Sequence, residues 1–197
     1  MEDRPVYHEK MRALQARFGS EALADSLAAL RRRRAFTEDD RAFIESRSFF
    51  HLATADAEGF PDCSYKGGAP RYVRITGPSS LAFPSLDGNG MYRSLGNILA
   101  NPKVGLLFMD FDRPRRLRVN GRARIAFEDP LMAEIPGAEM IVHVEDVAIF
   151  TNCPRYIHRG PELSPYLDRG DAPPPEPEWK TWPELAPHVP PRKGRPG

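Results

Sequence analysis

The stretch RRLRVNGRARI, residues 115–125, decides the fold because its residues alternate strictly in character. The even positions are polar: Arg116, Arg118, Asn120, Arg122 and Arg124. The odd positions 117, 119, 123 and 125 are apolar, and this parity continues across the glycine at 121. A two-residue hairpin turn at Asn120-Gly121 would place residues 119 and 122 on one face and break the alternation. The stretch therefore predicts a single strand, bent at its glycine, with one polar face.

Shorter runs on either side of this strand have the same β character. They are SFFHLATA (48–55), PDCSYK (61–66), RYVRIT (71–76), LAFP (81–84), KVGLLFMDF (103–111) and AEMIVHVEDVAIF (138–150). Such runs predict a mainly antiparallel sheet. The last run loses its alternation near Glu145-Asp146, which indicates a β-bulge. The segment EDPLMAEIP before it, residues 128–136, predicts a short helix.

The two ends of the chain differ from this β region. Residues 7–34 carry apolar positions at helical intervals, broken at Gly19-Ser20, and so predict two helices. Thr37 lies three residues before Asp40, a spacing that predicts a capping box and a third short helix. Eleven of the 21 prolines lie from residue 161 onward. We therefore expect an N-terminal helical extension (1–36), a β domain (37–159) and an extended proline-rich tail (160–197).

Composition excludes several classes of function. The chain has 28 Lys+Arg and 27 Asp+Glu, a net charge of +1, so no overall field attracts nucleic acid or a membrane. No run approaches the roughly 20 apolar residues of a membrane span, and the start does not resemble a secretory leader. Cys63 and Cys153 form no motif, and the five histidines have no metal-site spacing. We expect a cytoplasmic protein without a metal centre.

The stretch DGNGMYRSLGNILANP, residues 87–102, carries the strongest functional pattern. Its glycine-rich turn leads into a helix that Asp87 or Asn89 could cap, with Met91, Leu95, Ile98 and Leu99 as the apolar face. Arg93 then lies in the first turn, where a cation faces the positive end of the helix dipole. A bound phosphate would reverse the sign of that interaction, because free N–H groups, the Ser94 hydroxyl and Arg93 would all face one anion. The pattern predicts anion binding without naming the ligand.

Two other motifs leave alternatives open. Lys66-Gly67-Gly68 ends a predicted strand, where glycines allow either a bulge or the close approach of a flat ligand. NCPRYIHR, residues 152–159, places Arg155, Tyr156 and His158 just after the last strand. That segment is either an anchor for the tail or the edge of a site.

Four stretches, taken in order, resemble the pyridoxamine 5′-phosphate oxidase-like flavoproteins, and the likeness extends more weakly into both ends of the chain toward a bacterial subgroup of them. They are FFHLATADAEGFPDCSYKGG, LAFPSLDGNGMYRSLGNILANPKVGLLF, RRLRVNGRARI and NCPRYIHR, within residues 37–159. The resemblance implies the FMN-binding split barrel, a six-stranded Greek-key barrel with flanking helices. It also implies a homodimer that holds FMN non-covalently at its interface.

The resemblance assigns roles to particular residues. The phosphate motif falls on Tyr92, Arg93 and Ser94, after the turn that contains Asn89 and Gly90. The strand along the isoalloxazine edge falls on Ser64, Tyr65, Lys66 and Gly67. Arg116 takes the position of a glutamine that contacts the flavin, where a guanidinium near N1 and the C2 carbonyl would stabilise the charge of reduced flavin. Arg155, Tyr156 and His158 are candidates for the substrate side, and no catalytic residue is assigned.

Departures from the family pattern shape the expected function. The oxidases' phosphate-binding lysine falls near Ala69, and neither their Tyr…Arg…Ser substrate cluster nor their C-terminal Trp-plus-Arg signature is found. We therefore expect an FMN-dependent oxidoreductase whose small-molecule substrate is not pyridoxamine phosphate, with NAD(P)H as a candidate electron donor. Alternatives are a flavin- or haem-binding protein without turnover and a deazaflavin-dependent reductase on the same barrel. A nucleic-acid-binding barrel, based on Arg31–Arg34 and the arginine face of 116–124, comes last.

Overall fold

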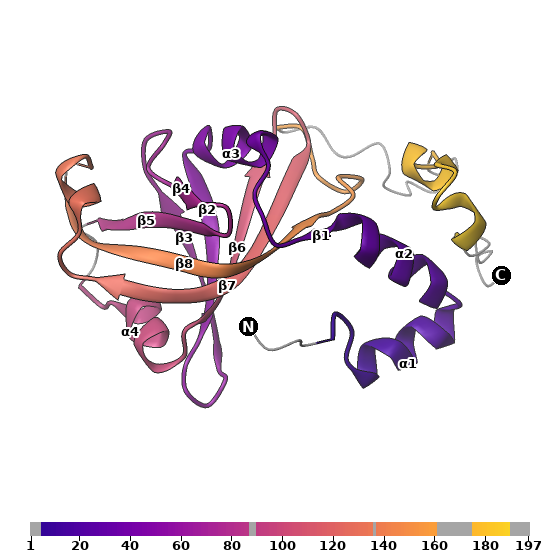
Figure 1. Cartoon of the computed structure of the whole chain (residues 1–197), viewed down its shortest axis with the longest axis horizontal. Coiled ribbons are helices and arrows are strands. Elements are labelled where there is room, and N and C mark those ends of the chain that lie inside the picture. Colours follow the sequence, from indigo (N-terminus) through magenta and orange to yellow (C-terminus); the bar gives the residue numbers. More distant parts are fainter. Residues whose placement is uncertain (1–4, 87–89, 136, 161–174, 190–197) are drawn as a thin grey trace. The chain divides into compact units, whose positions relative to one another are not determined.

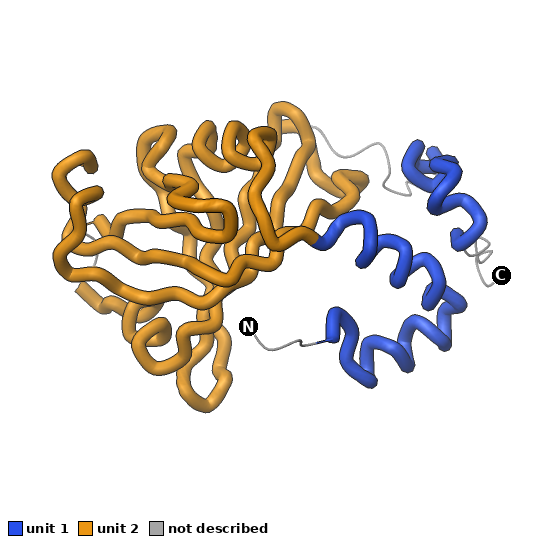
Figure 2. The backbone as a smooth tube through the Cα atoms, viewed as in Figure 1, with its two compact units in different colours: residues 1–32, 164–197 blue, residues 33–163 orange. Residues whose placement is uncertain are grey.

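The computed structural model of the chain describes residues 5–86, 90–135, 137–160 and 175–189. The chain divides into two compact units, shown in different colours in Figure 2. One unit comprises residues 33–163, and the other comprises residues 1–32 together with 164–197.

The unit of residues 33–163 is built on one antiparallel sheet (Figure 1). Its main strands are β2 (Phe49–Ala55), β3 (Pro61–Gly67), β4 (Arg74–Gly77), β5 (Ser80–Leu86), β6 (Lys103–Asp110), β7 (Arg115–Ala126) and β8 (Ala138–Thr151). They pair in the order β3-β2-β6-β7-β8-β5-β4, and pairing among the described strands leaves the sheet open at β3 and β4. The predicted mainly β split barrel is confirmed. The sheet has eight strands rather than six because it also includes β4 and the two-residue β1 (Arg32–Arg33).

Strand β7 is continuous, as its alternation predicts. Its odd positions from Leu117 to Ala123 are buried, whereas Arg118, Asn120 and the arginines after it are exposed. Gly121 is required by close packing against β8. A Cβ at this position would lie 2.6 Å from Val144 Cγ1 and 2.8 Å from the Glu145 carbonyl oxygen. The glycine is therefore a packing requirement of a strand, and the hairpin interpretation is excluded.

Strand β8 contains the predicted bulge. Asn120 faces Ala148 and Arg122 faces Glu145, so a step of two residues on β7 is matched by three on β8. Asp146 has a φ of 52°, a left-handed conformation that one type of β-bulge adopts. The short helix predicted before β8 is the 3-10 helix η1 (Pro130–Ala133).

The core lies on the inner face of the sheet and is covered by two helices. Phe50 is central to it, with ring centroids of Phe83 and Phe108 at 5.0 and 5.2 Å. Helix α3 (Glu38–Glu45) buries Phe43 and Ile44 there, and α4 (Arg93–Ala100) buries Leu95 and Ile98. Each such side chain contributes about 1.5–3 kcal/mol relative to an exposed one. Packing therefore fixes both helices on the unit.

The start of α3 is the predicted capping box. The Thr37 hydroxyl accepts from the Asp40 N–H at 3.2 Å, and the Asp40 carboxylate accepts from the Thr37 N–H at 2.9 Å. Arg33 adds a paired contact to the same carboxylate, which is 1% exposed. Burial raises the pKa of Asp40, but the hydrogen bonds from Arg33 and Thr37 outweigh it and hold that pKa below its ordinary value. Side chains of the protein therefore cap this helix end.

The second unit contains α1 (Glu9–Phe18), α2 (Glu21–Arg31) and two 3-10 helices, η2 (Glu178–Thr181) and η3 (Ala186–His188). Gly19 ends α1 with a φ of 62°, which confirms the predicted break. The predicted extended tail is not extended throughout, because residues 175–189 form turns in which Leu185 is buried. Trp182 in this segment contacts the end of α2: the Arg31 guanidinium lies 4.6 Å from the centroid of its ring. The rest of the tail lies outside the described residues. Within the described ranges, every helix is too short or too polar to cross a membrane.

Candidate functional site

The first turn of α4 is reached through left-handed backbone. Gly90 has a φ of 70° and Tyr92 a φ of 49°, and Arg93 is the first helical residue. Tyr92 occupies the N-cap position, and its side chain makes no capping hydrogen bond. The N–H groups at the start of a helix have no intrahelical partners, and no side chain among the described residues caps those of this first turn through the N-cap position, so they can donate to a ligand.

The sequence interpretation of α4 is correct for its core and wrong at its edges. Leu95 and Ile98 are buried as predicted, whereas Leu99 is 68% exposed. Met91 precedes the helix and is 62% exposed, because the left-handed residue at 92 turns the chain before the helical periodicity begins. The caps predicted at Asp87 and Asn89 lie outside the described residues.

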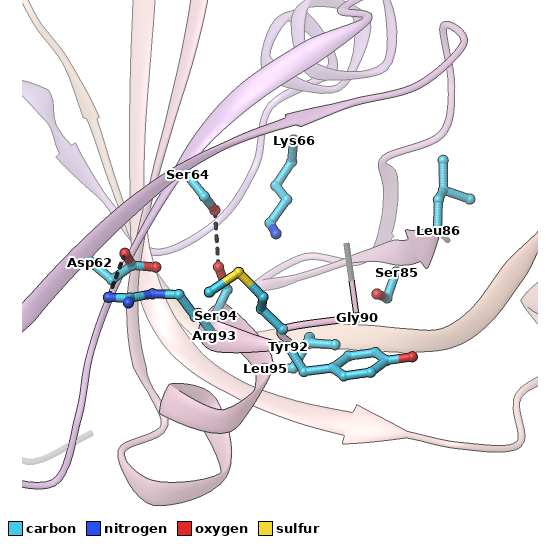
Figure 3. Close-up of a pocket in the computed structure, with 11 residues that line it drawn as sticks. Asp62, Ser64, Lys66, Ser85, Leu86, Gly90, Tyr92, Arg93, Ser94 and Leu95 are labelled. Atoms are coloured by element: carbon cyan, nitrogen blue, oxygen red, sulfur yellow. Dashed lines mark hydrogen bonds and ion pairs between the residues drawn. The ribbon is translucent and has the colours of Figure 1, made fainter. Parts of the chain in front are cut away.

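A pocket of about 230 Å³ lies between this helix end and β3 (Figure 3). Its lining residues are Asp62, Ser64, Lys66, Ser85, Leu86, Gly90, Met91, Tyr92, Arg93, Ser94 and Leu95. The Ser64 hydroxyl is 3.0 Å from the Ser94 hydroxyl, and Ser94 is only 5% exposed. Strand alternation brings every second residue of β3 to this face, so Ser64 and Lys66 both point into the pocket.

The Lys66 ammonium group enters a partly desolvated space. Burial lowers the pKa of Lys66, and the nearby Asp62 carboxylate offsets only part of that shift. An anion placed beside a desolvated ammonium stabilises its charged form. The expected phosphate-binding lysine falls near Ala69 in the sequence, and in the structure Lys66 supplies an ammonium group at the helix end.

Arg93 lies at the open rim of the pocket. Its side chain is 66% exposed, and its Nη2 lies 3.6 Å from Asp62 Oδ1. An exposed ion pair of this kind contributes about 0–1 kcal/mol, so it holds the guanidinium only loosely. Arg93 can therefore exchange this carboxylate for another anion at small cost.

The structure brings six of the predicted cofactor residues together in this pocket: Ser64, Lys66, Gly90, Tyr92, Arg93 and Ser94. Asn89 lies outside the described residues. Tyr65 and Gly67 belong to the opposite face of β3, where the Tyr65 ring stacks on Phe49 at 5.2 Å. These two residues do not line the pocket.

Arg116 lies apart from the pocket lining. Its Nη2 donates to the Cys153 carbonyl at 3.0 Å, and its Nε is buried with no hydrogen-bond partner among the described residues. The Asn152 Oδ1, on the residue that follows β8, is also buried and unpartnered in that part of the chain. A buried donor and a buried acceptor without partners are costly unless a ligand or water satisfies them.

The substrate-side candidates follow β8 and do not line the pocket. The Arg155 guanidinium lies 4.6 Å from the centroid of the Tyr156 ring, and Tyr156 is 55% exposed. His158 is also exposed. Their substrate role stays a prediction.

Sequence reasoning missed Asp62, Ser85 and Leu86 as lining residues. Asp62 could have been found, since it shares a strand face with Ser64 and Lys66 and is the only acid there. Ser85 and Leu86 carry no local signal, because β5 reaches the pocket through its pairing with β8. Among the described residues, no group of three His, Cys, Asp or Glu is placed to hold a metal ion.

The fold and the pocket together define an open antiparallel barrel with a cationic pocket at a helix N-terminus. The sequence model of the family described as pyridoxamine 5′-phosphate oxidase matches residues 36–155 of the chain. The chain belongs to this family.

Several solved structures are similar to the chain. A candidate pyridoxamine 5′-phosphate oxidase from Lactobacillus delbrueckii has 22% identity and a TM-score of 0.49, covering 61% of this chain and 99% of that one. HupZ from Group A Streptococcus has 22% identity and a TM-score of 0.47, with 59% and 93% covered. The haem storage protein HutZ from Vibrio cholerae has 16% identity and a TM-score of 0.39, with 58% and 89% covered. No curated protein matches the chain.

Proposed function

We propose that the protein is an FMN-dependent oxidoreductase that acts on a small-molecule substrate and holds the FMN phosphate in the pocket at the start of α4. The observation that carries this proposal is the convergence of four polar side chains on the N-terminal end of α4. Ser64, Lys66 and Ser94 line the pocket, and Arg93 stands at its rim. Hydroxyl, ammonium and guanidinium donors beside free helix N–H groups are what a phosphate monoester requires.

The size of the pocket fits part of FMN. Sites that enclose a drug-sized ligand usually measure roughly 300–1,000 Å³, and this pocket measures about 230 Å³. It has room for a phosphate and the adjoining chain atoms. The ring system would then lie outside the pocket, along the backbone of residues 64–67.

Arg116 fits a polar atom at the edge of that ring system. Its guanidinium carries a fixed positive charge, and its Nε is a buried donor without a partner among the described residues. Asn152 supplies a buried acceptor that also has no partner among the described residues. It lies near Arg116 because their chain neighbours, Thr151 and Leu117, are paired across β8 and β7. A ligand with adjacent acceptor and donor atoms would satisfy both groups.

We further propose that the protein is a homodimer. The outer face of β2 and β3, opposite to the pocket, carries an apolar cluster that a second copy of the chain would cover: the rings of Tyr65, Phe49 and Phe111 are nearly parallel, and Tyr65 and Phe111 are 64% and 41% exposed. Exposed aromatic clusters are typical of interfaces.

When bound, FMN supplies hydride or single-electron transfer to a substrate. The chain's own residues would then have two tasks: Ser64, Ser94 and Arg93 would bind the phosphate, and β3 would orient the ring by its backbone. NAD(P)H is the electron donor that we propose. The substrate is a small molecule other than pyridoxamine phosphate, since the family's substrate-phosphate cluster is missing from the sequence.

The test is an absorption spectrum of the purified full-length chain, followed by mass analysis of the small molecule released on denaturation. FMN in near one-to-one amount supports the proposal. No flavin, even after incubation with FMN, would overturn it, and release of a deazaflavin or of haem would replace it by the corresponding alternative. Reduction by NAD(P)H and reoxidation by an added acceptor would then separate an enzyme from a carrier.

A further inference from the structure

Among the described residues that line the pocket, Asp62 is the only acidic side chain, and a phosphate site has no evident use for it. It is 21% exposed and lies on the same face of β3 as Ser64 and Lys66. Figure 3 shows its carboxylate beside the Arg93 guanidinium, with Oδ1 and Nη2 3.6 Å apart. A carboxylate in such a place repels an incoming anion.

The positive charges of the pocket give the Asp62 carboxylate a role in its lining. Lys66 and Arg93 converge on a helix end that itself carries a positive partial charge. Asp62 offsets this repulsion by pairing with Arg93 and by raising the pKa of Lys66 against the effect of its burial. The carboxylate therefore keeps two cations in position before any ligand arrives.

We propose that Asp62 is a specificity-determining counter-charge that gives up Arg93 to an incoming phosphoryl group and limits how tightly that group is held. This inference rests on the proposed phosphate site and adds a residue that sets the affinity of that site. The loose ion pair lets Arg93 move to the phosphate at small cost. The carboxylate stays in the lining and opposes the added negative charge, so the site binds a phosphate monoester reversibly.

The experiment compares FMN with riboflavin, which lacks the phosphate, by quenching of flavin fluorescence on the full-length chain freed of cofactor. Asp62→Asn should bind FMN about three- to tenfold more tightly than the unaltered chain, with riboflavin affinity unchanged within about twofold. Glu58→Gln is the matched control, because it removes an exposed negative charge from the turn between β2 and β3 without touching the pocket. It should leave both affinities unchanged.

A double-variant cycle tests whether Asp62 acts through Arg93. In the Arg93→Gln background, the gain from Asp62→Asn should shrink by at least half, because the pair that competes with phosphate is gone. An unchanged or weaker FMN affinity in Asp62→Asn would overturn the inference and leave the phosphate site standing. If the folded chain binds neither flavin, or binds both equally tightly, the phosphate site fails and the inference fails with it.

Discussion

Helices α3 and α4 each have eight residues and bury two apolar side chains in the same core, but they begin in opposite ways. The first turn of α3 holds three acids and a complete capping box. The first turn of α4 has no acid and has a cation at its first position, and the side chain of its N-cap residue, Tyr92, makes no capping hydrogen bond. Since both helices are fixed by packing, the difference lies in what satisfies their N-terminal N–H groups.

The contrast separates a structural helix end from one that is available to a ligand. At α3, the N-terminal N–H groups of Thr37 and Asp40 donate to each other's side chains, and Arg33 pairs with the Asp40 carboxylate. At α4, a pocket lies against the helix end, and its lining carries three serine hydroxyls, the Tyr92 hydroxyl and two cations. Substitutions at the first end should therefore act on stability, and substitutions at the second should act on binding.

The largest effect is expected at the capped end. Asp40→Ala should lower the free energy of unfolding by about 3 kcal/mol, because it removes a buried carboxylate and leaves the Arg33 guanidinium and the Thr37 N–H without it. Urea unfolding measures this change. Glu38→Gln, at an exposed position of the same turn, should change stability by less than about 0.5 kcal/mol. A loss below 1 kcal/mol for Asp40→Ala would show that the capping box contributes little.

At the open end, Arg93→Gln should leave unfolding nearly unchanged and weaken FMN binding about 10- to 100-fold, the usual range for one hydrogen bond to a charged group. Riboflavin binding should not change, because it lacks the phosphate. Titration of both flavins measures this difference. Arg124→Gln is the control, since Arg124 pairs on the surface with Glu145 and does not line the pocket. Equal losses for both flavins would contradict a phosphate contact.

The left-handed N-cap of α4 allows a smaller and sharper test. Tyr92→Gly should be more stable than Tyr92→Ala by about 1 kcal/mol, because both remove the ring but only glycine adopts a φ of 49° without strain. At Ala42, a solvent-exposed position in the middle of α3, alanine should be more stable than glycine. Ala42→Gly should therefore lower the free energy of unfolding by about 1 kcal/mol. Thermal or urea unfolding of the three variants decides the point. Equal stabilities at position 92 would mean that the local backbone relaxes.

The smallest effect concerns pH at the capped end. The folded pKa of Asp40 lies below its unfolded value, so its contribution to stability is present above the unfolded pKa and is lost as pH falls through the folded pKa. The free energy of unfolding should therefore fall less steeply below about pH 4 in Asp40→Asn than in the unaltered chain. The difference between the two slopes should be smaller than the slope produced by the uptake of one proton. Urea unfolding at several acidic pH values measures both slopes. Parallel slopes for the two proteins would contradict the lowered pKa.

The sequence predicts the elements whose signals are local. The break at Gly19-Ser20, the capping box of α3, the continuous β7 and the bulge near Asp146 are all confirmed. Each depends on residues within a few positions of one another, through a left-handed glycine, a cap spacing or a change of alternation.

What the sequence misses depends on contacts between distant segments. The exposure of Leu99 follows from how α4 lies on the sheet, and the pocket includes Ser85 only because β5 pairs with β8. The separation of Tyr65 from Lys66 could have been inferred, since neighbours on a strand face opposite ways. The anion site at the start of α4 was inferred from Arg93, because a cation in the first turn of a helix is unfavourable without an anion, and it stays a prediction.

The bulge in β8 has a consequence for how this chain tolerates changes in length. Before it, Val142 and Val144 face the core, and after it Val147 and Ile149 do, so the inward positions change from even to odd numbers. Deletion of the single residue Asp146 would remove the bulge and keep Val147 and Ile149 facing the core, because Glu145 and Val147 would then follow each other in regular alternation. Deletion of Ala148 has no extra residue to absorb it. It would turn Ile149 outward and reverse the face of every residue up to Thr151, carrying the misplacement on to the Cys153 carbonyl that holds Arg116. A loss of three nucleotides from the gene would therefore be far more damaging at position 148 than at position 146.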